Sequence, residues 1–196
     1  MNLPNKLTAS RFVLTIAFLG VMFSKVRFHE TIALVLFMAG GITDFFDGYI
    51  ARRDKLITNF GILMDPLADK IMVCSAFIAF VGLNWIQPWM VVIIVARELA
   101  ITGLRLLAAS KGVVLAAEGY GKHKTITQIV AIISILVRAA YLQWGKIGQA
   151  VFGFQVFGEP WVNAFTQLAV WLAVILTFTS GWLYLWRNRP LYLADM

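Results

Sequence analysis

Apolar residues gather along this chain in six stretches, each long enough for a helix that crosses a bilayer core, which needs about 20 residues. The predicted helices cover residues 7–25, 30–53, 62–83, 88–110, 123–143 and 161–186. The last stretch is the clearest, because no charged residue lies between Val162 and Trp186. The pattern therefore predicts an all-α membrane protein with six transmembrane helices.

Polar residues mark the breaks between these helices. Asn84 to Pro88 interrupts an otherwise uncharged run and predicts a turn between two antiparallel helices. Pro4 and Asn5 precede the first apolar run and predict an amphipathic N-terminal segment on the membrane surface. Residues 145–160 are expected to form a loop on the outer side.

Composition supports a bilayer environment. Of the 196 residues, 60% are hydrophobic and 14% charged, and the mean hydropathy of +0.79 is well above that of ordinary soluble domains. The net charge of +7 comes from basic residues that flank apolar stretches instead of forming one basic domain. Anionic lipids and phosphorylated substrates are therefore the expected partners, and nucleic acid is not. No repeat or composition break divides the chain, so residues 1–196 are expected to form one domain.

The distribution of Lys and Arg predicts the orientation, because cytoplasmic loops of membrane proteins carry the basic excess. With the N-terminus inside, three basic residues clearly oppose the rule: Lys25, Arg27 and Lys146. Those that follow it are Lys6, Arg11, Arg52, Arg53, Lys55, Lys70, Lys111, Lys122, Lys124, Arg187 and Arg189. The N-terminus is therefore expected on the cytoplasmic side.

Four aspartates lie where carboxylates are costly. Asp44 and Asp47 are three residues apart in the second predicted helix, and Asp65 and Asp69 are four apart in the third, so each pair shares a helix face. A charge at membrane depth costs several kcal/mol unless it is paired or bound to metal, so such acids are candidates for function. The alternative is that they pair with Arg52, Arg53 and Lys70.

The donor set favours hard metal ions. Four carboxylates without a nearby Cys or His suit Mg²⁺ or Mn²⁺ better than zinc. Two such ions, typically about 3.5 to 4 Å apart, neutralise a diphosphate and stabilise its leaving oxygen. A two-metal site is therefore expected.

The spacing Asp44-x2-Asp47-Gly48-x2-Ala51-Arg52-x8-Gly61-x3-Asp65-x3-Asp69 resembles the signature of the CDP-alcohol phosphotransferase family, and it covers 26 residues. The resemblance implies six membrane helices, two divalent metals, a homodimer and an active site that opens to the cytoplasmic leaflet, here of a bacterial inner membrane. It implies that Asp44, Asp47 and Asp65 bind the first metal and that Asp44, Asp65 and Asp69 bind the second. It also implies that Asp69 is the catalytic proton acceptor.

Residues around the motif are implied to bind the nucleotide of CDP-diacylglycerol: Asn5, Thr8, Gly48, Arg52 and Thr58. Arg52 can fork onto phosphate oxygens. Gly48 could equally pack between helices, and Asn5 and Thr8 could equally cap the first helix.

The second half of the chain carries cations suited to an anionic acceptor: Arg97, Arg105, Lys122 and Lys124. Arg97 could instead pair structurally with Glu98, and the lysines could only set topology. Lys122 and Lys124 begin a helix, where anionic ligands are favoured. The runs around them are most similar to family members that use glycerol 3-phosphate.

Three other readings stay open. Inositol phosphate, serine or phosphatidylglycerol could be the acceptor. An ion or phosphate transporter could also use intramembrane acids, but it would carry polar residues through the bilayer midplane. Here the acids stop near the inner interface, which favours the enzyme. A purely structural subunit would leave the four aspartates unexplained.

Overall fold

A computed structural model describes residues 3–54, 59–113, 115, 120–156 and 158–193, with side chains over 9–43, 70–113, 115, 124–156 and 158–192. Within these ranges the long helices are α1 (Leu3–Met22), α2 (His29–Asp54), α3 (Asn59–Gly82), α4 (Pro88–Ser110), α5 (Tyr120–Ala140) and α7 (Trp161–Arg187). They match the six predicted helices to within a few residues. The mostly helical fold is thereby confirmed.

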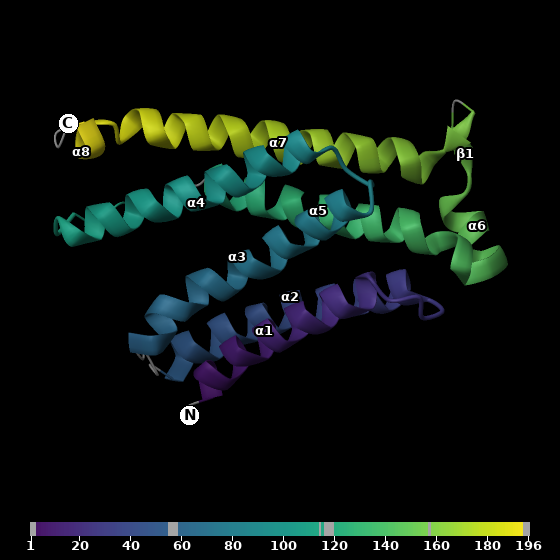
Figure 1. Ribbon diagram of the computed structural model, residues 1–196, viewed down its shortest axis with the longest axis horizontal. Coiled ribbons are helices and arrows are strands. Elements are labelled where there is room, and N and C mark those ends of the chain that lie inside the picture. Colours follow the sequence, from purple (N-terminus) through teal and green to yellow (C-terminus); the bar gives the residue numbers. More distant parts are fainter. Residues whose placement is uncertain (1–2, 55–58, 114, 116–119, 157, 194–196) are drawn as a thin grey trace.

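The long helices run back and forth between two ends of the molecule (Figure 1). The N-terminus, the C-terminus, the last turns of α2 and the first turns of α3 lie on the left in this view. The turns that follow α1 and α3 lie toward the right, as do the elements between α5 and α7. Helix α1 packs on α2 and α3, and α7 packs on α4 and α5.

One hydrophobic core contains side chains from all six long helices, α1, α2, α3, α4, α5 and α7. Its largest fully buried side chains include Phe18 of α1, Phe77 and Phe80 of α3, and Ile94 of α4. Helix α5 contributes Ile132, Ile135 and Leu136, none of which has exposed surface. The last two-thirds of α5 is therefore central to the bundle.

Large apolar side chains also cover the outside of the bundle. Val35, Val92 and Leu99 are 60%, 64% and 68% exposed, in α2 and α4. Two helical stretches, Lys124–Phe152 and Trp161–Arg187, are long and apolar enough to cross a membrane. This combination indicates a membrane protein, because the bilayer covers apolar surface that water would not.

Local chemistry sets the limits of α4. Gln87 is extended and Pro88 occupies the first turn, where its missing N–H and fixed φ suit a helix start. After Ser110 the chain leaves the helix through Gly112, whose φ of +69° suits glycine. The predicted start and end of this helix are therefore confirmed.

The segment between α5 and α7 differs from the predicted loop. It contains a 3₁₀ turn η1 (Tyr141–Trp144), helix α6 (Gly145–Phe152) and a small antiparallel hairpin of β1 (Gln155–Val156) and β2 (Glu159–Pro160). The ring of Phe152 lies 5.5 Å from that of Trp144 and 6.0 Å from that of Trp161. These aromatic contacts hold the segment against the ends of its neighbours, so the prediction of a plain loop was wrong.

Both ends of the chain contain helix. Helix α1 is continuous from Leu3 to Met22, so a separate N-terminal surface segment is not confirmed. After α7 the short helix α8 (Pro190–Leu193) follows. Lys111, just after α4, donates a hydrogen bond to the carbonyl of Leu191 at 2.9 Å, which ties α8 to the end of α4.

Candidate active site

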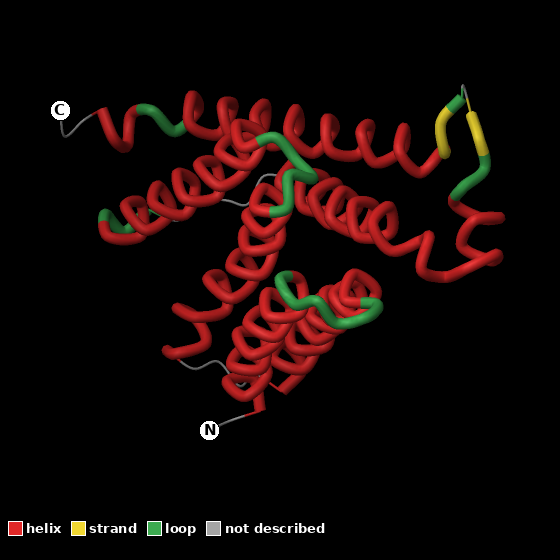
Figure 2. The backbone as a smooth tube through the Cα atoms, turned by 45° about the vertical axis from the view of Figure 1, so that its right-hand side comes forward, coloured by secondary structure: helices red, strands yellow, loops and turns green. Residues whose placement is uncertain are grey.

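The acidic motif lies across two consecutive helices. Asp44 and Asp47 are in the C-terminal half of α2, and Asp65 and Asp69 are in the N-terminal half of α3. These two helix halves meet at one end of the molecule (Figures 1 and 2). Unbroken helix at both places keeps each pair on one helix face, as predicted. The side chains of all four aspartates lie outside the described part of the structure.

Other predicted site residues fall in similar positions. Asn5 and Thr8 are in α1, Gly48 and Arg52 in α2, and Lys122 in α5. The surroundings of these five residues lie outside what the structure describes. Thr58 lies outside the described residues. The roles of these six residues stay predictions.

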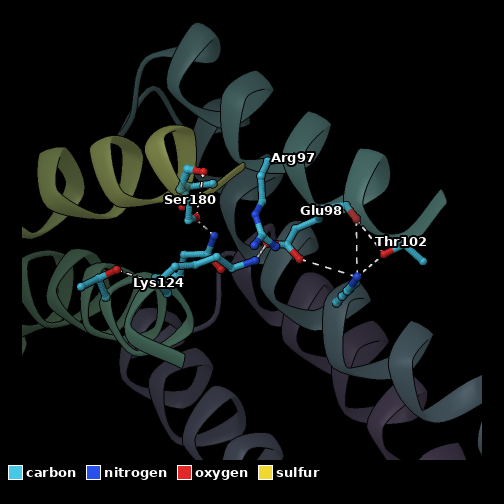
Figure 3. Close-up of polar contacts among 9 residues, drawn as sticks. Arg97, Glu98, Thr102, Lys124 and Ser180 are labelled. Atoms are coloured by element: carbon cyan, nitrogen blue, oxygen red, sulfur yellow. Dashed lines mark hydrogen bonds and ion pairs between the residues drawn. The ribbon is translucent and has the colours of Figure 1, made fainter. Parts of the chain in front are cut away.

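Directly after Asp69, the structure describes a buried polar cluster centred on Glu98 of α4. The Lys70 Nζ lies 3.7 Å from Glu98 Oε2, and the Arg97 Nη1 lies 3.5 Å from Glu98 Oε1. Lys124 of α5 forms a third ion pair with Glu98 Oε1. Figure 3 shows Arg97, Glu98 and Lys124 converging between the helices. One carboxylate therefore draws cations from α3, α4 and α5 to a single point.

Backbone and hydroxyl groups fix this arrangement. Lys70 also donates to the hydroxyl of Thr102 and, at 3.4 Å, to the main-chain carbonyl of Glu98. Thr102 in turn donates to the same carbonyl at 2.7 Å. Lys70 is the first residue after the motif, and these bonds attach it to α4. Helices α3 and α4 are therefore joined next to Asp69.

Cations outnumber carboxylates among the described members of the cluster. Three cations, Lys70, Arg97 and Lys124, contact the carboxylate of Glu98. A cavity of about 30 Å³ adjoins Lys70, Glu98 and Lys124. Poorly solvated positive charge attracts anions strongly. The described geometry therefore suits an anion that approaches the motif.

Helix α7 packs closely against the side chain of Arg97. A Cβ placed on Gly181 would lie 2.6 Å from Arg97 Cγ, so only glycine leaves room for the arginine stem. The Arg97 Nε is buried and has no hydrogen-bond partner among the described residues. Arg97 is therefore positioned by packing and keeps one donor for a ligand.

Arg105 lies further along α4 and contacts α7. Its Nε donates to the hydroxyl of Tyr184 at 3.4 Å, and its guanidinium lies 5.8 Å from the centre of the Tyr184 ring. Tyr184 packs with Ile101 and Leu104 in a second, smaller core. Arg105 is itself exposed, so its guanidinium is accessible to a ligand.

Sequence reasoning did not assign Lys70, Thr102 or Glu98 to the site. The signal was present, because Glu98 is an acid within an apolar helix and Lys70 adjoins the motif. Arg11 is a similar case: it was interpreted only as a topology charge, yet it is 4% exposed in α1.

The motif is the candidate metal centre. Among the described side chains, no group of three or more His, Cys, Asp or Glu could hold a metal ion. The motif instead offers only carboxylate oxygens, which fit Mg²⁺ or Mn²⁺. The continuous helices that carry Asp44, Asp47, Asp65 and Asp69 meet at one end of the bundle, which suits a shared site.

Comparisons with known proteins agree with this motif. The sequence profile of the CDP-alcohol phosphatidyltransferase family matches residues 1–179. The CDP-diacylglycerol--glycerol-3-phosphate 3-phosphatidyltransferase of Bacillus subtilis is 38% identical over 95% of both chains. The protein of the same name from Cereibacter sphaeroides is 32% identical over 99% of this chain and 98% of its own. The one from Rickettsia typhi is 32% identical over 93% and 94%. This chain therefore belongs to the CDP-alcohol phosphatidyltransferase family.

Proposed function

We propose that this chain is the enzyme that transfers the phosphatidyl group of CDP-diacylglycerol to glycerol 3-phosphate, with release of CMP. The observation that carries the proposal is the near full-length similarity to the three bacterial phosphatidyltransferases that share this reaction in their names. The product, phosphatidylglycerophosphate, is a precursor in phospholipid synthesis.

The reaction needs a base and an in-line displacement. Asp69 accepts the proton of the acceptor hydroxyl, and the freed oxygen forms a bond to the β-phosphorus of CDP-diacylglycerol. The bond from that phosphorus to the CMP oxygen breaks, and CMP leaves with the electron pair. The position of Asp69 in α3 supports this role, because the next residue, Lys70, contacts Glu98 of α4 in the polar cluster.

Asp44, Asp47, Asp65 and Asp69 hold two divalent cations, Mg²⁺ or Mn²⁺. When bound, these ions supply charge neutralisation at the diphosphate. Asn5, Thr8, Gly48, Arg52 and Thr58 bind the CDP portion of the lipid. The positions of the first four in α1 and α2, toward the same end of the molecule, support this grouping.

Arg97, Arg105, Lys122 and Lys124 bind the phosphate of the acceptor. The convergence of Arg97 and Lys124 on Glu98 supports this role, since an anion would compete with Glu98 for these two cations. The free Nε of Arg97 offers a further donor. Charge-assisted hydrogen bonds of this kind are roughly twice as strong as neutral ones.

We place the chain in a bacterial-type cytoplasmic membrane as a homodimer, with six transmembrane helices and the motif toward the cytoplasm. The gathering of basic residues at the motif end of the bundle supports this orientation.

Product formation by purified protein tests the proposal. Incubation with CDP-diacylglycerol and radiolabelled glycerol 3-phosphate should give a labelled lipid and one CMP per product, and a chelator should stop the reaction until Mg²⁺ or Mn²⁺ is restored. Unlabelled inositol phosphate, serine and phosphatidylglycerol should not compete. A labelled product with one of these acceptors in place of glycerol 3-phosphate would overturn the acceptor assignment and keep the chemistry.

A further inference from the structure

A second pocket lies at the end of the bundle away from the motif. It has a volume of about 200 Å³ and opens between the α3–α4 turn, the end of α5 and the first turns of α7. Its polar and aromatic lining residues are Asn84, Trp85, Gln87, Arg138, Thr166, Gln167 and Trp171. Asp69 lies 13 residues before Gly82, the last residue of α3, which is a rise of about 20 Å along the helix, so this pocket is separate from the candidate active site.

Arg138 is the chemical centre of this pocket. It is the sole charged residue between Lys124 and Lys146. Its Nη2 donates to the carbonyl of Trp85 at 3.3 Å, and no carboxylate of the described chain forms an ion pair with it. A guanidinium carries five N–H donors. Most of its donors and its whole charge are therefore left for a ligand.

The neighbouring side chains are neutral and polar. The side-chain amides of Asn84, Gln87 and Gln167 make no hydrogen bond to another described residue, and no acid is among the described residues that line the pocket. Asn84 has a φ of +58°, which lies in the left-handed region, and it is exposed in the turn. The lining thus offers several donors around one positive charge, which suits a phosphate-sized anion.

The surroundings of the pocket match the headgroup level of a bilayer. Helices α5 and α7, which form two of its walls, belong to the two stretches apolar enough to cross a membrane. Trp171 packs on Trp89 with ring centres 5.7 Å apart, and Trp85 stacks on Phe80 at 5.7 Å. Tryptophans gather at membrane interfaces, and arginine extends its charge to that level.

We propose that this pocket binds the phosphate of an anionic phospholipid headgroup in the leaflet opposite the active site, with Arg138 as its anchor. The choice of leaflet rests on the orientation proposed above, whereas the pocket and its charge do not. The lipid headgroup lies between the α3–α4 turn and α7, beside the hydrogen bond that ties Arg138 of α5 to Trp85 of the turn.

Native mass spectrometry of the detergent-purified full chain tests this site. Wild type should retain phosphatidylglycerol more tightly than phosphatidylcholine. Arg138→Gln should weaken the tightest phosphatidylglycerol adduct about tenfold, the loss expected for one charge-assisted contact. Arg138→Lys should restore part of it. Arg27→Gln removes an exposed cation from a turn at the same end and should leave the adduct unchanged.

A double glutamine variant and a competition with inorganic phosphate complete the test of this site. Gln87→Leu with Gln167→Leu alters the lining without removing a side-chain hydrogen bond within the described chain and should also weaken the adduct. Equal retention of phosphatidylglycerol by wild type and Arg138→Gln would overturn the proposal, as would equal losses of phosphatidylglycerol and phosphatidylcholine. Displacement of the lipid by millimolar inorganic phosphate would assign the site to free phosphate instead. Turnover of glycerol 3-phosphate by the same variants separates this result from the proposed function.

Discussion

Lys124 of α5 and Glu98 of α4 form a buried ion pair, with side chains only 5% and 7% exposed. Two more cations, Lys70 and Arg97, contact the same carboxylate. A buried carboxylate with several cationic partners is stable only while the charges compensate one another. Glu98 therefore holds together the cationic side chains that would otherwise repel.

Glu98→Gln should destabilise the protein strongly. The substitution keeps the shape of the side chain but removes the carboxylate that Lys70, Arg97 and Lys124 share, which costs about 3 kcal/mol. The expected result is a clear drop in the thermal unfolding midpoint in detergent. Glu159→Gln is the matched control, because Glu159 is exposed in the hairpin. An unchanged midpoint for Glu98→Gln would show that the cluster carries no stability.

The sequence predicted the helices well because they depend on local properties. Runs of apolar residues gave the six long helices, and Pro88 marked the start of α4. The contact between Lys70 and Glu98 joins residues 28 positions apart, and it depends on how α3 crosses α4. Spacing along one helix cannot predict a contact of that kind.

Two other features of the structure could not be predicted from the sequence pattern. The sequence alone could not decide whether Arg97 binds a ligand or pairs with its neighbour Glu98. In the structure, Arg97 Nη1 lies 3.5 Å from Glu98 Oε1. In the sequence, Gly145 looks like a simple loop signal. In the structure it has a φ of +64°, yet helix α6 begins there. Aromatic packing of Phe152 on Trp144 and Trp161 outweighs that signal.

Gly181→Ala should impair use of the acceptor. The new Cβ would lie 2.6 Å from Arg97 Cγ and would displace the aliphatic part of the arginine side chain from its position. Small displacements of a positioning group cost activity steeply, so we expect kcat/KM for glycerol 3-phosphate to fall about tenfold, mostly through KM. Gly103→Ala is the control, since nothing lies within 4 Å of its added Cβ. Equal kinetics of the two variants would contradict a positioning role for Gly181.

Arg105 and Tyr184 should differ in how much they contribute to acceptor binding. Arg105→Gln removes a charge proposed to contact phosphate, and KM for glycerol 3-phosphate should rise about tenfold. Tyr184→Phe keeps the ring beneath the guanidinium and removes only the acceptor of a 3.4 Å hydrogen bond, so KM should rise less than threefold or so. The KM for CDP-diacylglycerol should stay unchanged in both. A rise in that KM would move Arg105 to the nucleotide site.

The bond between Gln128 and Thr177 should stabilise the contact of α5 with α7. Gln128 Nε2 donates to Thr177 Oγ1 at 3.0 Å, and the residues are 2% and 0% exposed. Thr177→Val leaves a buried amide unpaired and should cost about 1 kcal/mol. Gln128→Leu in the same chain should recover most of that loss in a double-mutant cycle of unfolding midpoints. Additive losses would show that the two groups do not depend on each other.

Asp69→Asn separates the chemistry from the fold. The amide keeps the size of the side chain but cannot accept the acceptor proton, so kcat should fall by about 10² to 10⁴. Asp54→Asn, at the last residue of α2 and outside the motif, should retain full turnover. The unfolding midpoint of both variants should stay near that of wild type. Recovery of Asp69→Asn at high Mg²⁺ would show that Asp69 acts only as a metal ligand, whereas a loss that persists at saturating Mg²⁺ supports its role as the base.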